Sequence, residues 1–148
     1  MADQISDVLQ HLRQLLLADA TFAATISDGA VYTAQPRTAV DTIPMPCVIF
    51  EVGPGRPFPA AVPGQQLSID CYVFSRDSQG HAFSLYESAR VLLNMARLYS
   101  GVTSNGDRVN KTNGYVEESA RPEGGWHEAY SAWLAHGRYT AYTATGTT

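Results

Sequence analysis

Residues 67–74 read Leu-Ser-Ile-Asp-Cys-Tyr-Val-Phe, and apolar side chains fill every second position of this stretch. Because successive side chains of a strand point to opposite faces of a sheet, this period of two predicts a strand with one apolar face. Apolar positions then recur at helical spacing, and Asp77 or Ser78 can cap the first turn of a helix predicted over residues 78–99. Gly101 follows as a helix stop. The strand and the helix together predict a fold that mixes sheet and helices.

The first half of the chain carries a second helix pattern and a second strand pattern. Apolar residues at three- and four-residue spacing predict a helix over residues 3–18. The β-branched and aromatic run at 47–52 predicts a strand that ends at a Gly-Pro-Gly sequence. Three prolines in residues 25–46 predict a loop with at most one short strand near 30–33. Four prolines in residues 53–64 predict a long, stiff loop between the two strands of a hairpin.

The C-terminal part of the chain predicts two more strands. Residues 110–121 form the first, interrupted at Asn113-Gly114, and residues 122–125 are expected to make the turn. The last strand is predicted over residues 126–142. The Thr-rich residues 141–148 are expected to fray as a flexible tail.

One face of this last strand carries no formal charge. It consists of Ala129, Ser131, Trp133, Ala135, Gly137 and Tyr139. Small residues in such a row let a helix lie close on the sheet. We therefore expect Trp133 to be buried beneath the helices.

The order of these elements predicts an α+β fold in a single domain over residues 1–148. Its mainly antiparallel sheet has about four strands, with two helices packed on one face. Alternatively, the helix over 78–99 is a crossover that makes one strand pair parallel. The opposite sheet face is only half polar, because Tyr72, Phe74 and Leu134 lie among charged residues. Such a face marks an interface, or carries scattered surface aromatics that need no explanation.

The composition limits the classes of partner. Charged residues make up 16% of the 148-residue chain, against a usual value of about 25%. Few charges suit packing against other subunits, although an ordinary monomer with a polar surface fits equally well. The net charge of -4 and the scattered basic residues disfavour tight binding of nucleic acid. No stretch approaches the ~18 apolar residues of a membrane span, and the N-terminus lacks the pattern of a signal peptide.

The sequence contains none of the motifs that mark common catalytic or metal sites. It lacks Gly-x-Ser-x-Gly, His-Glu-x-x-His and the glycine-rich phosphate loops. Glu117 and Glu118 are adjacent, so we expect them on opposite faces of a strand, and we expect the same of His127 and His136 on the last strand. The sequence therefore predicts no enzyme activity, no metal and no cofactor.

The two cysteines lie in apolar runs, outside any metal or redox spacing. We expect Cys47 and Cys71 to be buried free thiols, with a bridge between neighbouring strands as the alternative. The sequence leaves open whether they are close in space.

The order of five segments resembles a known family. The segments are Leu15-Leu16-Leu17-Ala18-Asp19, Val31-Tyr32 followed by Pro44-Met45-Pro46-Cys47-Val48-Ile49-Phe50, Leu67-Ser68-Ile69-Asp70-Cys71-Tyr72, Leu85-Tyr86-Glu87-Ser88-Ala89-Arg90-Val91-Leu92-Leu93, and a closing aromatic strand. Over about residues 5–139, the chain resembles the tail terminator, or tail completion, proteins of long-tailed bacteriophages and related gene transfer particles. The most specific element is the Ile69-Asp70-Cys71-Tyr72 strand that leads into the second helix.

This resemblance implies a virion structural protein, assembled in the host cytoplasm, with no catalysis and no cofactor. The subunit would close into a hexameric ring on the head-proximal end of the tail tube, end tube polymerisation and offer a head-tail joining surface. Its partners would be further copies of itself, the tail tube protein and a neck or connector protein. Six subunits of net charge -4 would carry about -24, which lets DNA pass through the ring without specific binding.

Two other functions fit the sequence. One is another head-tail connector or neck protein, which would bind the capsid-side adaptor in place of the tail tube. The other is a small enzyme or ligand-binding domain, which would need a pocket with converging polar groups.

Four residues are the predicted contacts to partners. Arg56 and Phe58 lie in the proline-rich loop, and an arginine and an aromatic are side chains enriched at interface hot spots. The alternative for Phe58 is that it packs onto its own subunit. Tyr72 and Phe74 belong to the half-polar sheet face. The long loop over 53–64 and the Thr-rich end depart from the family pattern, so which loop contacts which partner stays open.

Overall fold

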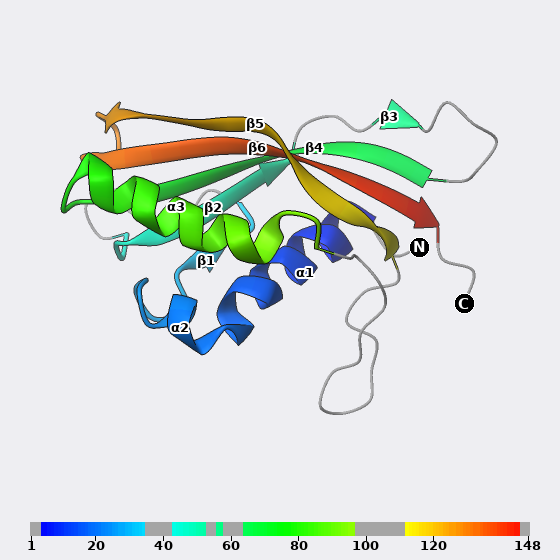
Figure 1. The fold of residues 1–148 in the computed structure, drawn as a ribbon, viewed down its shortest axis with the longest axis horizontal. Helices are drawn as coiled ribbons and strands as arrows, with labels where there is room; N and C mark the ends of the chain where they lie inside the picture. The colour runs from blue at the N-terminus through cyan, green and yellow to red at the C-terminus, as the bar shows by residue number, and fades with distance from the viewer. Residues whose placement is uncertain (1–3, 35–42, 53–55, 58–63, 97–111, 146–148) are drawn as a thin grey trace.

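The computed structural model describes residues 4–34, 43–52, 56–57, 64–96 and 112–145. A six-stranded sheet forms its centre, and helices pack on it (Figure 1). The expected α+β class is confirmed.

The described residues form three helices and six strands. The helices are α1 (Gln4–Ala18), α2 (Ala20–Ala23) and α3 (Gln79–Leu93). The strands are β1 (Val31–Tyr32), β2 (Cys47–Val52), β3 (Arg56–Pro57), β4 (Gly64–Ser75), β5 (Thr112–His127) and β6 (Ala132–Thr145). The sheet exceeds the predicted four main strands because β1 and β3 add two residues each.

The sheet is mainly antiparallel, as expected. Its strands follow the order β1-β2-β4-β6-β5, and β3 pairs with β4 beside this path. Only β1 and β2 pair in parallel among the described strands. α3 leads from β4 to β5, which run in the same direction with β6 between them. The crossover considered as an alternative therefore occurs, but the two strands that it joins are not neighbours.

The main core lies between the sheet and the helices α1 and α3. The apolar face predicted for β4 is fully buried there. Leu12 and Leu16 of α1 join this core, as the helical spacing predicts. Tyr86 of α3 is also fully buried, and its ring occupies the space that a side chain at Gly137 of β6 would fill. A glycine on β6 therefore lets a large aromatic ring of α3 lie against the sheet.

α3 begins as predicted but ends earlier. The Ser78 Oγ accepts a 3.0 Å hydrogen bond from the backbone N–H of His81, which caps the first turn. The last helical residue is Leu93 and not residue 99, so the predicted end is wrong. Gly101, predicted as the stop, lies outside the described residues.

The chain leaves α3 early because the following residues pair with the outer edge of β5. The Met95 N–H donates to the Val116 carbonyl at 2.6 Å, and the Val116 N–H donates to the Ala96 carbonyl at 2.9 Å. The Asn94 Oδ1 accepts a hydrogen bond from the Glu118 N–H at 2.8 Å. A longer helix would leave this stretch of strand edge unpaired. Apolar periodicity carries no information about such tertiary pairing.

The turn before the last strand lies at residues 128–131, and the prediction of 122–125 is wrong. β5 continues through the Pro-Glu-Gly-Gly stretch, with register shifts between Glu118 and Ala120 and between Ala120 and Glu123. Such bulges insert an extra residue and tolerate a proline without ending the strand. Ser131, with φ of 48°, lies at the turn instead.

The uncharged row predicted for the last strand is buried only in part. Ala135 is buried against the helices, whereas Ala129 and Ser131 belong to the turn and are exposed. Trp133 packs against the main core on the predicted face, but it is half-buried, so its expected burial beneath the helices is met only in part. Its ring lies edge-on at 5.1 Å from that of Trp126, which is 49% exposed.

β6 continues through much of the expected C-terminal tail. Ala141 is fully buried, and Thr143 and Ala144 pair with Gly114 and Asn113 of β5. The tail therefore does not begin at residue 141, and Asn113-Gly114 does not interrupt β5. Threonine is β-branched and favours such an extended strand.

The proline-rich loop over 53–64 contains a short strand. Arg56 and Pro57 form β3 and pair with Gln66 and Gln65 of β4. A proline fits at this position because an edge strand does not need every N–H. Phe58 and the loop residues 53–55 and 59–63 lie outside the described residues.

Candidate functional site

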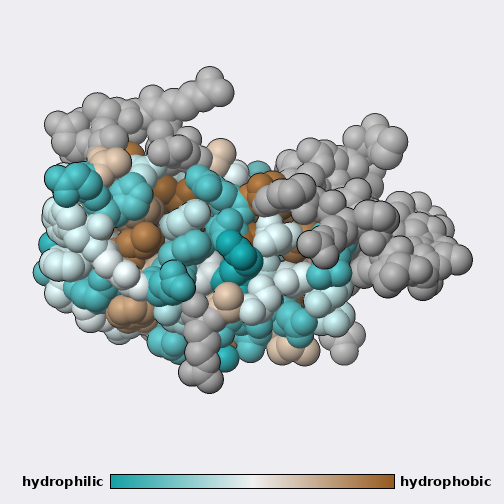
Figure 2. Space-filling view, turned by 90° about the horizontal axis from the view of Figure 1, so that it is seen from above, coloured by the Kyte–Doolittle hydropathy of each residue, from teal (hydrophilic) through white to brown (hydrophobic). Residues whose placement is uncertain are grey.

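The sheet face that points away from α1 and α3 carries a second apolar cluster. Its buried members are Ala30, Ile43, Cys47, Ile49, Phe74, Tyr130 and Ala132, and Tyr32, Met45, Tyr72 and Leu134 are partly buried around them. Figure 2 shows, from above, apolar areas at the surface between polar side chains. On this sheet face, we call the surface formed by Tyr72, Phe74, His127, Tyr130 and His136 the aromatic face.

Stacked and tilted rings build the aromatic face. The rings of Tyr72 and His136 stack with centroids 4.3 Å apart. Phe74 lies 4.7 Å from Tyr130 and 5.4 Å from His127, which meets it edge-on at 86°. Three separate parts of the chain supply these rings: β4, β6, and the end of β5 with its turn.

A hollow of about 250 Å³ opens on this face. Its lining consists of Ile49, Glu51, Tyr72, Phe74, His127 and Tyr130. Glu51 is exposed, whereas Phe74 is only 2% exposed and forms the floor. The hollow therefore combines aromatic walls with one carboxylate.

Of the two carboxylates beside the hollow, Asp70 is paired with basic side chains and, within the described residues, Glu51 is not. Asp70 Oδ1 lies 2.9 Å from the Nε2 of His136 and accepts a hydrogen bond from the Nε of Arg138 at 3.2 Å. Glu51 is opposite Asp70 in the β2–β4 register and forms no hydrogen bond or ion pair within the part of the chain that the structure describes. Burial, with smaller contributions from the carboxylates of Asp70 and Glu51, raises the pKa of the Tyr72 hydroxyl.

The predicted partner contacts fall into two groups. Tyr72 and Phe74 lie on the aromatic face with ring centroids 6.4 Å apart. Tyr72 is half-buried and accessible, whereas Phe74 contributes mainly to the cluster beneath. Arg56 lies on β3, which pairs with the far end of β4, and Phe58 is not among the described residues. These four residues do not form one described patch.

Sequence reasoning missed four residues of the hollow. Ile49 and Glu51 lie within the strand predicted over 47–52. The sequence pattern places Tyr130 within the last strand and His127 on the face opposite His136. In the structure His127 lies on β5 and His136 on β6, and both contact rings of the aromatic face. The predicted placement on opposite faces of one strand is wrong because the turn is shifted. Only the correct turn position would have brought these groups together.

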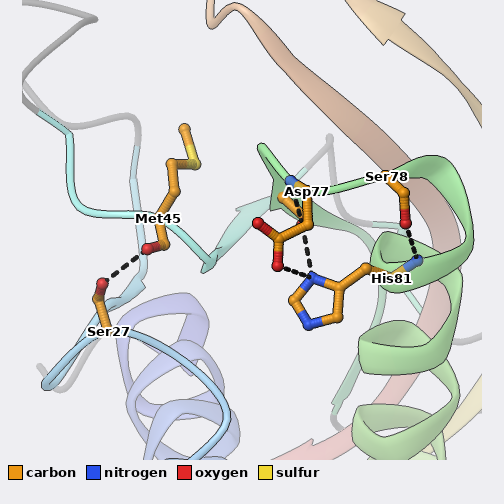
Figure 3. A network of polar contacts seen from close by, with 6 residues as sticks. Ser27, Met45, Asp77, Ser78 and His81 are labelled. Atoms are coloured by element: carbon orange, nitrogen blue, oxygen red, sulfur yellow. Dashed lines mark hydrogen bonds and ion pairs between the residues drawn. The ribbon is translucent and has the colours of Figure 1, made fainter.

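Ser75, Asp77 and His81 also lie close together at the start of α3. Figure 3 shows His81 between Asp77 and Ser78. Ser75 Oγ lies 2.6 Å and Asp77 Oδ2 lies 3.5 Å from the same ring nitrogen, Nδ1 of His81. In a catalytic triad the nucleophile and the acid use different ring nitrogens. Ser75 is fully buried, so its hydroxyl is not accessible to a substrate.

Glu117 and Glu118 point to opposite sides of β5, as predicted. The Glu118 carboxylate accepts hydrogen bonds from the Tyr86 hydroxyl at 2.7 Å and from the Arg90 Nε at 2.9 Å, beneath α3. The Glu117 Oε1 accepts one from the Tyr142 hydroxyl at 3.0 Å. These acids stabilise the fold and do not form an acid–base pair.

The cysteines are free and buried, as expected. Cys47 belongs to the cluster beneath the aromatic face, and Cys71 belongs to the main core. They lie on adjacent strands but on opposite faces of the sheet, so the alternative of a bridge is wrong.

The described ranges lack a cluster of metal ligands and a helix that could cross a membrane. No three His, Cys, Asp or Glu side chains there lie close enough together to hold a metal ion. None of the helices in those ranges is both long and apolar enough to cross a membrane.

Comparisons with known proteins identify a structural neighbour. No model of a protein family matches this chain, and no curated protein does. Among solved structures, a chain from the virion of a native gene transfer agent particle matches with a TM-score of 0.65 and 18% sequence identity. The match covers 97% of this chain and 99% of the other chain. At this identity the likeness shows that the two chains share a fold over nearly their whole length.

Proposed function

We propose that this chain is a structural protein of a phage-like virion. In this proposal, a ring of subunits caps the head-proximal end of the tail tube, ends tube polymerisation and provides the head-tail joining surface. The observation that carries the proposal is the end-to-end fold likeness to a chain of a gene transfer agent virion. The order of sequence segments described above supports the same family.

Two features of the surface support a role in assembly. The chain has few charges, and the aromatic face exposes part of a large apolar cluster. Aromatic groups such as Tyr72 are enriched at protein interfaces, where charged residues are depleted at the core. A face of this kind fits a subunit that is covered by other proteins in the virion.

The first test concerns assembly. We expect the purified protein to form rings of six subunits, either alone or on tail tubes. Negative-stain electron microscopy and light scattering measure this. Pull-down with the tail tube protein should succeed. Monomers under both conditions would contradict the proposal, and binding to a capsid-side adaptor in place of the tube would indicate a different head-tail connector.

The second test locates the interface. Replacing the accessible Tyr72 by serine should weaken assembly tenfold or more, because buried tyrosines at interface centres contribute at least ~1.4 kcal/mol. Tyr115→Ser is the matched control, since Tyr115 is 40% exposed on β5 and does not line the hollow. Equal loss of assembly in both variants, measured by sedimentation at constant thermal stability, would remove the aromatic face from the interface.

A further inference from the structure

Glu51 is the one acidic group that lines the hollow, and its charge is not compensated by a described neighbour. The carboxylate of Asp70 beside it is held by His136 and Arg138. Glu51 forms no hydrogen bond or ion pair within the described ranges. The rim of the hollow therefore carries a negative charge that is available to a binding partner.

The walls of the hollow favour a cation as well. Tyr72, Phe74 and Tyr130 supply aromatic rings around it. The face of an aromatic ring attracts a cation, and the attraction grows when water is excluded. An arginine side chain satisfies both requirements, because its planar guanidinium stacks on rings and pairs with a carboxylate through two N–H groups.

The size of the hollow argues for a single side chain. A volume of about 250 Å³ lies below the ~300 to 1,000 Å³ typical of small-molecule sites. An apolar side chain would fit sterically, but it would strip water from the Glu51 carboxylate without pairing it, which is costly. An anion would meet the same carboxylate and be repelled.

We infer that the hollow on the aromatic face binds an arginine side chain presented by a partner protein of the assembly. The guanidinium pairs with the Glu51 carboxylate at the rim, and the aliphatic stem lies against Tyr72 and Ile49. This inference rests on the proposed function for the identity of the partner class, but the site itself is defined by the hollow and its charge. It supplies the specificity that an aromatic surface alone would lack.

The experiment uses short peptides in place of the unidentified partner. The full chain is titrated with acetyl-Gly-Gly-Arg-Gly-Gly-amide and with the same peptide carrying citrulline, which keeps the shape and removes the charge. Binding is followed by the NMR signals of the aromatic rings. We expect the arginine peptide to bind at least about fivefold more tightly than the citrulline peptide, which corresponds to a contact with a ring and a carboxylate at a partly exposed site.

Matched variants test the two components of the site. Glu51→Gln should weaken binding of the arginine peptide about fivefold and leave the weak binding of the citrulline peptide unchanged. Glu87→Gln, which removes an exposed acid from α3, is the control for net charge and should change neither. Tyr72→Leu keeps an apolar wall but removes the ring, and it should weaken the arginine peptide selectively.

Three results would overturn the inference. They are equal binding of the two peptides, absence of any change in the ring signals at millimolar peptide, and equal effects of Glu51→Gln and Glu87→Gln. The proposed function is tested by a different measurement. A protein that binds the arginine peptide but forms no rings and does not bind tails would reject the assembly role alone. If the protein forms rings but does not bind the arginine peptide, this inference is rejected and the proposed function is retained.

Discussion

Replacing Gly137 by alanine is expected to lower the free energy of unfolding by roughly 2.5 to 6 kcal/mol. A Cβ at this position would overlap with the hydroxyl and the ring of Tyr86. Tyr86 is fully buried, so its ring cannot swing into solvent without leaving the core. Overpacking of this kind costs about 1 to 3 kcal/mol, and loss of the Tyr86 hydrogen bond to the Glu118 carboxylate adds about 1.5 to 3 kcal/mol. Urea unfolding of the variant measures the sum.

A second glycine provides the control. A Cβ at Gly80 of α3 would meet only the Ser78 Oγ at 3.9 Å, which is ordinary contact. Because glycine is a poor helix former, Gly80→Ala should leave stability unchanged or raise it by up to about 1 kcal/mol. In a Tyr86→Leu background, Gly137→Ala should cost much less than in the parent, since the obstructing ring is gone. An unchanged urea midpoint for Gly137→Ala alone would show that α3 does not lie against β6 as described.

Local patterns predicted the elements whose boundaries depend on their own residues. β2 has the predicted bounds, 47–52, because a β-branched run is bordered by Gly53 and Pro54. α1 and the apolar face of β4 follow from spacing alone. The predicted end of α3 is wrong because pairing of Met95 and Ala96 with β5 outweighs helical propensity. The predicted position of the turn is wrong because residues 122–125, which taken alone favour a turn, lie within the bulged strand β5.

The candidate site was predictable only where a single strand supplies it. Tyr72 and Phe74 stand out because they are aromatic on the polar side of an alternating strand. Glu51, His127 and Tyr130 reach the same hollow through the β2–β4 register and the position of the β5–β6 turn. Those are long-range features, and periodicity in one strand does not encode them.

Buried thiols make stability sensitive to alkaline pH. Burial raises the pKa of Cys47 from its ordinary value of 9.0 to about 12. Burial, with help from the carboxylates of Asp70 and Glu118, raises the pKa of Cys71 in the same direction. Burial likewise raises the pKa of the Tyr86 hydroxyl from 10.0. In each case the folded protein keeps a proton that the unfolded chain loses at lower pH.

The free energy of unfolding should therefore be constant with respect to these groups below pH 9 and fall as the pH rises towards 12. Above pH 9 the unfolded chain binds fewer protons than the folded protein, and each thiol then lowers stability by about 1.4 kcal/mol per pH unit. Two thiols give a loss of roughly 4 to 5 kcal/mol between about pH 9 and pH 11, which is comparable with the total stability of many domains. Urea unfolding at a series of pH values measures this slope. The double variant Cys47→Ala and Cys71→Ala should start from a lower stability, because it leaves cavities, but decline less steeply over the same range. Equal slopes in the parent and the double variant would show that the thiols ionise freely in the folded protein, and hence that neither lies in the dry interior of the two clusters.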